Sequence, residues 1–201
     1  MEGSGCKAKS LRCLTSMLLS TICIKTEKYK FIKGNTTDFE LVSKLVKASD
    51  AIVNVAAETH VDRSIADPLP FLHSNVIGTF NLLEAIRRFN DDAKLVQVSS
   101  DEVYGDMLNG SAQETDFLNP SSPYSASKAA ADSFCSAYHR TYGLNIVTTR
   151  CTNNFGPYQF PEKFIPKAII RAIKDLQIPI YGSGKNVRDW IYVEDHCDAI
   201  Y

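Results

Sequence analysis

Short apolar segments rich in β-branched residues alternate along this chain with longer amphipathic segments, and this alternation constrains the fold more than any other feature. Four short segments have the character of strands: 29–33, 51–57, 94–99 and 145–150. Three longer segments carry apolar residues at helical spacing: 39–48, 74–88 and 123–142. Strands and helices that alternate over short connections predict a parallel sheet with helices on both faces, a doubly wound α/β fold.

The composition is that of an ordinary folded protein. The chain has 201 residues, of which 44% are apolar, and its 22 basic and 23 acidic side chains leave a net charge of −1 at pH 7. Because the charge nearly cancels, we expect no nucleic-acid partner. The six cysteines show no C-x-x-C spacing and no grouping with histidine. We therefore expect reduced thiols in the cytoplasm and no bound metal.

The two ends of the chain differ from its middle. Residues 11–25 form the most apolar stretch, and basic residues precede it as in a secretory signal, but no small-residue cleavage pattern follows. This stretch is too short and too polar to span a membrane as a helix, so we expect a buried helix or strand. After Cys151 the pattern becomes less regular and is interrupted by Pro157, Pro161, Pro166 and Pro179. The expected division is an atypical segment at 1–28, an incomplete α/β domain at 29–157 and part of a further region at 158–201.

Two adjacent carboxylates follow the strand expected at 94–99. Asp101 and Glu102 come directly after Ser100, at the carboxyl end of the strand, where ligands bind in open parallel sheets. Adjacent carboxylates repel one another, and partial burial raises the pKa of at least one of them, which suits a general acid beside a general base. The alternative is a polar loop in which Asp101 caps the next turn.

A tyrosine and a lysine lie one helical turn apart in the segment 123–142. Tyr124 and Lys128 share one face of the expected helix. Because a neighbouring ammonium favours the phenolate, we expect it to lower the pKa of Tyr124 below the usual value of ~10. Such a tyrosine can accept a proton from a substrate hydroxyl while a hydride leaves the same carbon. The Y-x-x-x-K spacing alone occurs by chance in many helices.

A strand that ends in serine, followed about two dozen residues later by Y-x-x-x-K, is similar to the extended short-chain dehydrogenase/reductase superfamily. Four segments in order narrow the resemblance to the dTDP-glucose 4,6-dehydratase family: AAETHVDRS, SSDEVYG, RCTNNFGPYQFPEKFIP and YGSGKNVRDWIYVEDH. The resemblance runs from about residue 29 to the end. It implies a Rossmann-like fold, NAD as cofactor, a nucleotide sugar as substrate and a homodimer.

The resemblance also implies roles for individual residues. The implied catalytic residues are Ser100, Asp101, Glu102, Tyr124 and Lys128. The implied NAD contacts are Asn35, Thr36, Val55, Ala56, Ala57, Thr59, Ser74, Tyr124, Lys128 and Asn154. The implied substrate contacts are Thr59, Ser100, Asn153, Lys163, Phe164, Pro179, Ile180, Tyr181 and Arg188. The two cations among the substrate contacts suit a diphosphate, although a solvated surface cation is the alternative from the residues alone.

The implied reaction is the dehydration of dTDP-glucose to dTDP-4-keto-6-deoxyglucose through transient reduction of NAD. In this scheme Tyr124, assisted by Lys128, accepts the O4 proton, and the Ser100 hydroxyl holds the same oxygen. Glu102 then removes the C5 hydrogen, and Asp101 protonates the C6 hydroxyl as it leaves as water. Related NAD-dependent nucleotide-sugar 4-epimerases generally lack the acidic pair.

The sequence departs from the family at its N-terminal side. It has no strand followed by a glycine-rich turn to hold the pyrophosphate, and no acidic residue about 20 positions later to bind the ribose. Asn35 stands where an aspartate is usual. In the order 3-2-1-4-5-6 the first strand is central, so its loss opens a gap, and residues 14–24 could fill one slot. A non-catalytic remnant that binds nucleotide sugar is therefore the second hypothesis.

Overall fold

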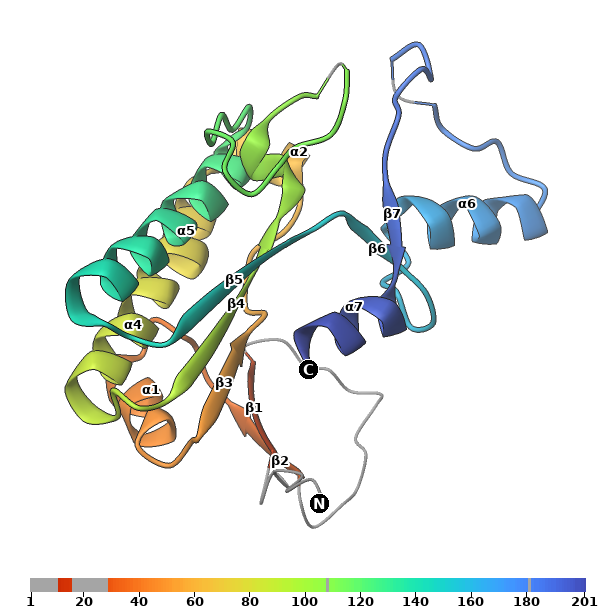
Figure 1. The fold of residues 1–201 in the computed structure, drawn as a ribbon. Coiled ribbons are helices and arrows are strands. Elements are labelled where there is room, and N and C mark those ends of the chain that lie inside the picture. Colours follow the sequence, from red (N-terminus) through yellow and green to blue (C-terminus); the bar gives the residue numbers. More distant parts are fainter. Residues whose placement is uncertain (1–10, 16–28, 108, 181) are drawn as a thin grey trace, which may run out of the picture.

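The main sheet of the protein consists of three parallel strands in the order β3–β4–β5 (Figure 1). The structure is a computed structural model that describes residues 11–15, 29–107, 109–180 and 182–201. The strands are β3 (Ala51–Asn54), β4 (Lys94–Ser100) and β5 (Ile146–Cys151). Each lies where the sequence predicted a strand, and the expected α/β fold class with a parallel sheet is confirmed.

Three helices pack on one face of this sheet (Figure 1): α1 (Phe39–Val46), α4 (Gly78–Phe89) and α5 (Pro123–Tyr142). The core between them and the sheet contains the fully buried Leu83, Ile86 and Leu95. On the opposite face Val53 and Val147 are 49% and 55% exposed, so the described residues cover that face only thinly.

The ends of α5 follow from local chemistry. Ser122 and Ser125 form a reciprocal capping box at its start, and Gly143 at its end adopts a φ of 72°, in the left-handed region that favours glycine. Between β3 and α4 the chain forms α2 (Val61–Ala66), α3 (Leu69–Phe71) and a π-helical turn, η1 (Leu72–Ile77). The helix predicted at 74–88 is therefore divided between η1 and α4.

A separate pair of parallel strands is formed by β1 (Leu11–Thr15) and β2 (Tyr29–Lys33). In the described part of the chain β2 and β3 are not paired, so β3 has a partner on one edge only. This is the gap expected from the missing central strand. Of the segment 14–24 that we expected to fill one slot, only the first two residues belong to β1, and residues 16–24 lie outside the described residues.

The C-terminal part is more regular than its prolines suggested. Strand β6 (Asn153–Phe155) pairs in parallel with β7 (Trp190–Tyr192), and the helices are α6 (Phe164–Ile173) and α7 (Val193–Ile200). The sequence analysis missed α6 because Pro166 was taken as an interruption. Proline is tolerated in the first turn of a helix, where this one lies. None of the helices in the described ranges is long and apolar enough to cross a membrane.

Candidate active site

The acidic pair lies in a short 3₁₀ turn, η2 (Asp101–Tyr104), which follows directly after β4. The Ser100 hydroxyl donates to Asp101 Oδ1 at 3.2 Å and accepts from the backbone N–H of Glu102 at 3.3 Å. Burial raises the pKa of both carboxyls. The Ser100 hydroxyl and then Arg188 oppose this for Asp101, whereas Arg188 and Lys163 oppose it for Glu102. The raised pKa that we predicted for adjacent carboxylates at a strand end is confirmed in direction.

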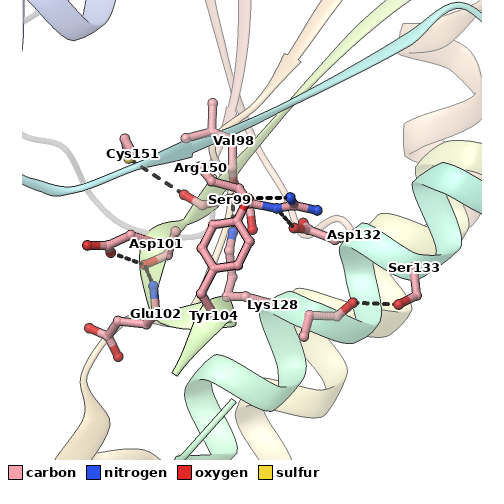
Figure 2. Close-up of polar contacts among 12 residues, drawn as sticks. Val98, Ser99, Asp101, Glu102, Tyr104, Lys128, Asp132, Ser133, Arg150 and Cys151 are labelled. Carbon is pink, nitrogen blue, oxygen red and sulfur yellow. Dashed lines mark hydrogen bonds and ion pairs between the residues drawn. The ribbon is translucent and has the colours of Figure 1, made fainter. Parts of the chain in front are cut away.

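Lys128 is buried and directed toward the sheet rather than toward solvent. Its Nζ donates to the carbonyl oxygen of Val98 at 2.7 Å (Figure 2). Burial lowers the pKa of Lys128, and the neighbouring Asp132 carboxylate opposes that change. The ammonium is thus held at β4, one turn along α5 from Tyr124.

Tyr124 is half-buried, and its ring lies edge-on to Phe71 with 6.3 Å between centroids. Burial raises the pKa of Tyr124 to about 12; the Ser100 hydroxyl opposes the change, and the charges of Glu102 and Asp101 add to it. Our prediction of a lowered pKa is therefore wrong for the free chain. The reason is that desolvation of the phenol outweighs any effect of the ammonium.

The two predicted catalytic pairs are close enough to interact electrostatically. The charges of Asp101 and Glu102 in η2, directly after β4, act on the phenol of Tyr124 at the start of α5. This is the juxtaposition on which the implied dehydration depends. Which atoms each group acts on remains a prediction.

The predicted substrate residues approach this site from the C-terminal part. Lys163 Nζ donates to Thr59 Oγ1 at 3.4 Å, which brings together two of these residues from distant parts of the chain. Arg188 is close enough to both carboxyls of the acidic pair to lower their pKa. Asn153 donates to the backbone oxygen of Asp189 at 3.3 Å.

Three further predicted substrate residues lie in less enclosed surroundings. Phe164 is 59% exposed, and its ring lies 6.4 Å from that of Trp190. Pro179 and Ile180 are exposed as well. Tyr181 lies outside the described residues. Phe164, Pro179 and Ile180 have no described contact with the acidic pair.

The residues expected at the adenine end of NAD lie in the turn after β2. Asn35 Oδ1 accepts from the backbone N–H of Thr37 at 3.0 Å. The side chain of Asn81, on α4, donates to the backbone oxygens of Thr36 and Thr37 at 3.2 and 3.0 Å. A Cβ at Gly78 would collide with the Thr36 hydroxyl, so only glycine permits this approach of the turn to α4.

The other expected cofactor residues follow β3 or lie near it. Val55 is 66% exposed, Ala56 and Ala57 are half-buried, and the backbone N–H of Ala56 donates to Asn54 Oδ1 at 3.3 Å. Ser74 is half-buried in the π-helical turn η1. These positions lie toward the carboxyl ends of the strands, as do Tyr124 and Lys128.

The side-chain amide of Asn154 is hydrogen-bonded to other groups of the protein. Its Oδ1 is 2.7 Å from His196 Nδ1, and its Nδ2 donates to the backbone oxygen of Thr152 at 3.2 Å and to Cys151 Sγ at 3.4 Å. The resemblance had implied that Asn154 contacts NAD. The structure instead links His196, on α7, to the strand that carries Asn154.

The sequence analysis missed a buried asparagine beside the site. Asn75 Oδ1 accepts from the backbone N–H of Glu58 at 2.8 Å, and its Nδ2 donates to the Glu58 carbonyl at 3.1 Å and to Ser127 Oγ at 2.8 Å. It therefore fixes the loop after β3 to α5. An asparagine on the apolar face of a helical pattern was the signal that could have identified it.

Comparison with known proteins decides the family. Residues 9–201 match the family model described as GDP-mannose 4,6 dehydratase. The chain belongs to this family. Among curated relatives, the dTDP-glucose 4,6-dehydratase of Mycolicibacterium smegmatis is 51% identical over 178 residues, covering 87% of this chain and 53% of the relative. That of Xanthomonas campestris is 49% identical over 181 residues, covering 85% and 52%. The chain thus spans about half the length of the curated relatives it matches.

Solved structures of the family show the same similarity. A dTDP-glucose 4,6-dehydratase from Streptomyces venezuelae, crystallised with NAD and dTDP, matches with a TM-score of 0.91 and 42% identity over 97% of this chain and 62% of that one. A UDP-glucuronic acid 4-epimerase from Bacillus cereus matches with a TM-score of 0.80 and 28% identity over 86% and 54%. The resemblance to dTDP-glucose 4,6-dehydratases is confirmed, and identity favours them over the epimerase.

Proposed function

We propose that this protein is an NAD-dependent nucleotide-sugar 4,6-dehydratase, a lyase that converts dTDP-glucose to dTDP-4-keto-6-deoxyglucose in nucleotide-sugar biosynthesis, such as that leading to rhamnose. The observation that carries the proposal is the position of the acidic pair in the turn directly after β4, the strand to which Lys128 of the Y-x-x-x-K motif is hydrogen-bonded, with the charges of the pair acting on Tyr124. The dehydratase identity of the relatives and the NAD bound in the Streptomyces structure support it.

The described residues fit the nicotinamide end of NAD better than its diphosphate. A half-buried phenol with an ammonium one turn away suits a nicotinamide ring at a reacting carbon. No glycine-rich turn occurs in the described ranges to hold the diphosphate. When bound, NAD supplies a hydride acceptor that later returns the hydride. The residues that would hold it are those implied by the resemblance.

The Tyr124 phenol acts on the O4 hydroxyl of the sugar. Its oxygen accepts the O4 proton as the C4 hydrogen leaves as hydride, and Ser100 Oγ holds O4 by a hydrogen bond. Because the pKa of Tyr124 is high in the free chain, the phenol carries its own proton there, and it must release that proton to solvent before its oxygen can accept the one on O4. Lys128, fixed by Val98, contributes positive charge beside the developing phenolate.

The acidic pair then removes water from the ring. The ketone formed at C4 makes the C5 hydrogen acidic, and ionised Glu102 accepts it as a proton. Protonated Asp101 gives its proton to the C6 hydroxyl, which leaves as water. The hydride adds to C6 and a proton returns to C5, so one water is lost and no cofactor is consumed. The raised pKa of both carboxyls fits a pair in which one is neutral and one ionised.

Product analysis in heavy water tests this proposal. The chain is incubated with NAD and dTDP-glucose in D₂O, and the products are examined by NMR and mass spectrometry. A dehydratase gives the 4-keto-6-deoxy sugar with deuterium at C5. A 4-epimerase gives the galactose isomer without deuterium, which would refute the dehydratase assignment.

The second candidate is a non-catalytic remnant that binds nucleotide sugar, and the unpaired edge of β3 favours it. Titration calorimetry separates the two hypotheses. A dehydratase binds NAD measurably and turns over, whereas a remnant gives no heat with NAD and no product but still binds dTDP-glucose.

We further propose a homodimer that works in the cytoplasm. The exposed aromatic side chains Phe134 and Tyr142 on α5 support an interface between helices of two copies. Free thiols at Cys135, Cys151 and Cys197 fit a reducing compartment. The division into 1–28, 29–157 and 158–201 is also a proposal, with β6 and β7 forming a paired link across the second boundary.

A further inference from the structure

The guanidinium of Arg150 bridges two side chains that the proposed mechanism does not use. Its Nε donates to Asp132 Oδ2 at 2.9 Å, and its Nη1 donates to the hydroxyl of Tyr104 at 2.7 Å. The guanidinium carbon also lies 5.0 Å from the centre of the Tyr104 ring. Figure 2 shows Arg150 between the tyrosine ring and the carboxylate.

Arg150 and the two residues that it bridges lie on three different elements, namely β5, η2 and α5. Tyr104 is the last residue of η2 and follows Glu102 by two positions. Asp132 lies on α5, one turn beyond Lys128 and two turns beyond Tyr124. Arg150 lies on β5, directly opposite Ser99 in the register of the sheet. One side chain therefore connects the turn that carries the acidic pair to the helix that carries the phenol.

Burial makes this connection costly to break. Asp132 is 3% exposed, and its other oxygen, Oδ1, has no described hydrogen-bond partner. Without Arg150 this buried carboxylate would lose the ion pair that offsets its desolvation, because the Nζ of Lys128, one turn away, is hydrogen-bonded to Val98 instead. A planar guanidinium can meet a carboxylate and a hydroxyl at once with fixed geometry, which a lysine at the same position cannot do.

Apart from the bonds of the Ser100 hydroxyl to Asp101 and Glu102, few described hydrogen bonds hold the turn η2 in place. Among the described residues, the backbone N–H of Gly105 donates to the Glu102 carbonyl at 3.2 Å, and that of Asn119 donates to the Val103 carbonyl at 2.9 Å. The first of these bonds is internal to the turn, and the second joins it to an irregular segment. Val103 is fully buried, but neither backbone bond connects η2 to α5.

We infer that Arg150 is a positioning residue: through Tyr104 and Asp132 it fixes the distance between the Asp101–Glu102 pair and the Tyr124–Lys128 pair. The chemical roles of the two pairs rest on the proposed function, whereas the contacts of Arg150 with Tyr104 and Asp132 do not. A displacement of the acidic pair by about 1 Å would be expected to cost on the order of a hundredfold in turnover. Arg150 has no described contact with the Tyr124 phenol or with the carboxyls of the acidic pair, so its effect on them is indirect.

The test uses ¹⁹F NMR of the full chain labelled with 3-fluorotyrosine. The resonance of Tyr124, assigned from its absence in Tyr124→Phe, should move with pH as the acidic pair titrates, because these charges act on the phenol. Tyr104→Phe removes only the hydroxyl that accepts the hydrogen bond from Arg150 and keeps the ring. The expected result is a smaller pH-dependent shift of the Tyr124 signal than in the parent, since the Coulomb interaction falls with distance.

Two further variants separate bridging from charge and from a general loss of stability. Arg150→Lys keeps a positive charge near Asp132 but cannot reach both partners, so it should behave like Tyr104→Phe. Tyr142→Phe, on the exposed side of α5, is the matched control and should leave the Tyr124 titration unchanged. An unchanged Tyr124 titration in both Tyr104→Phe and Arg150→Lys overturns the inference.

A turnover assay on the same samples keeps the two proposals apart. With NAD and dTDP-glucose, Tyr104→Phe should lower kcat about tenfold, the effect of one charge-assisted hydrogen bond, and leave KM unchanged. A parent chain that forms no product refutes the proposed function, whereas the NMR titration still decides whether Arg150 positions the pair. Parental kcat in Tyr104→Phe overturns the positioning role.

Discussion

The buried carboxylate of Glu84 provides a quantitative test of the helical layer. Its Oε1 accepts from Arg87 Nε at 2.7 Å and from the hydroxyl of Tyr138 at 2.8 Å, while Arg88 pairs with Oε2. The Tyr138 bond joins α4 to α5, whereas both arginines lie on α4 with Glu84. Chiefly through the Arg87 hydrogen bond, these bonds lower the pKa of Glu84 from 4.5 to about 2.

We predict that Glu84→Gln lowers the free energy of unfolding at pH 7 by about 1.5 kcal/mol. At about 1.36 kcal/mol per pKa unit, the lowered pKa corresponds to roughly 3.4 kcal/mol, an upper bound. The arginines are 34% and 51% exposed, so screening by solvent reduces the bound by about half. Because the folded pKa is depressed, this stability is present above pH 4.5 and is lost as the pH falls toward 2.

Urea denaturation followed by circular dichroism measures the difference between parent and variant. The difference should shrink steadily from pH 5 to pH 2.5, because over this range Glu84 becomes protonated in the unfolded parent while it stays largely ionised in the folded one. Glu40→Gln is the matched control: its pair with Lys44 is 2.8 Å long but lies on the exposed face of α1, so unfolding should hardly change. A Glu84→Gln effect that is absent at pH 7, or constant down to pH 2.5, would refute the reasoning.

Three further predictions concern the site. Tyr124→Phe should lower kcat by about 10²–10⁴ with intact folding, measured by product formation, since general base catalysis contributes that much; parental turnover would exclude the phenol. The pH profile of kcat/KM should rise as the first carboxyl of the acidic pair ionises and fall as the second does, both above their ordinary values; a profile flat between pH 4 and 8 would contradict the shared role. Asn75→Ala should lower the free energy of unfolding by about 2 kcal/mol, because it leaves backbone groups of Glu58 without hydrogen bonds. A melting temperature within about 1 °C of the parent's would contradict this, since a loss of that size shifts the melting temperature by several degrees.

The sequence predicted those parts of the fold that depend on neighbouring residues. Helix α5 lies at 123–142, as expected, because its ends are set by a serine cap and a glycine within the same segment. The strands of the main sheet were predicted from their apolar runs. The π-helical turn η1 was not predicted, because a shift from the α-helical hydrogen-bond pattern leaves the apolar spacing almost unchanged.

The parts of the site that depend on tertiary contacts could not be predicted. The acidic pair and Y-x-x-x-K were visible as motifs, but the direction of the Tyr124 pKa depends on how deeply the phenol is buried. The pairing of Arg150 with Asp132 depends on the packing of β5 against α5, for which no local spacing gives a signal. The unpaired edge of β3 was foreseen because a missing strand follows from strand order.

The central claim is that Glu102 is the base at C5 and acts separately from Tyr124. Its most direct test is Glu102→Gln, assayed with NAD and dTDP-glucose in D₂O for NADH absorbance and for deuterium at C5. The account predicts transient NADH comparable to that of the parent and no deuterium at C5, because O4 deprotonation is intact and the C5 base is lost. Deuterium incorporation at the parental rate would contradict the account.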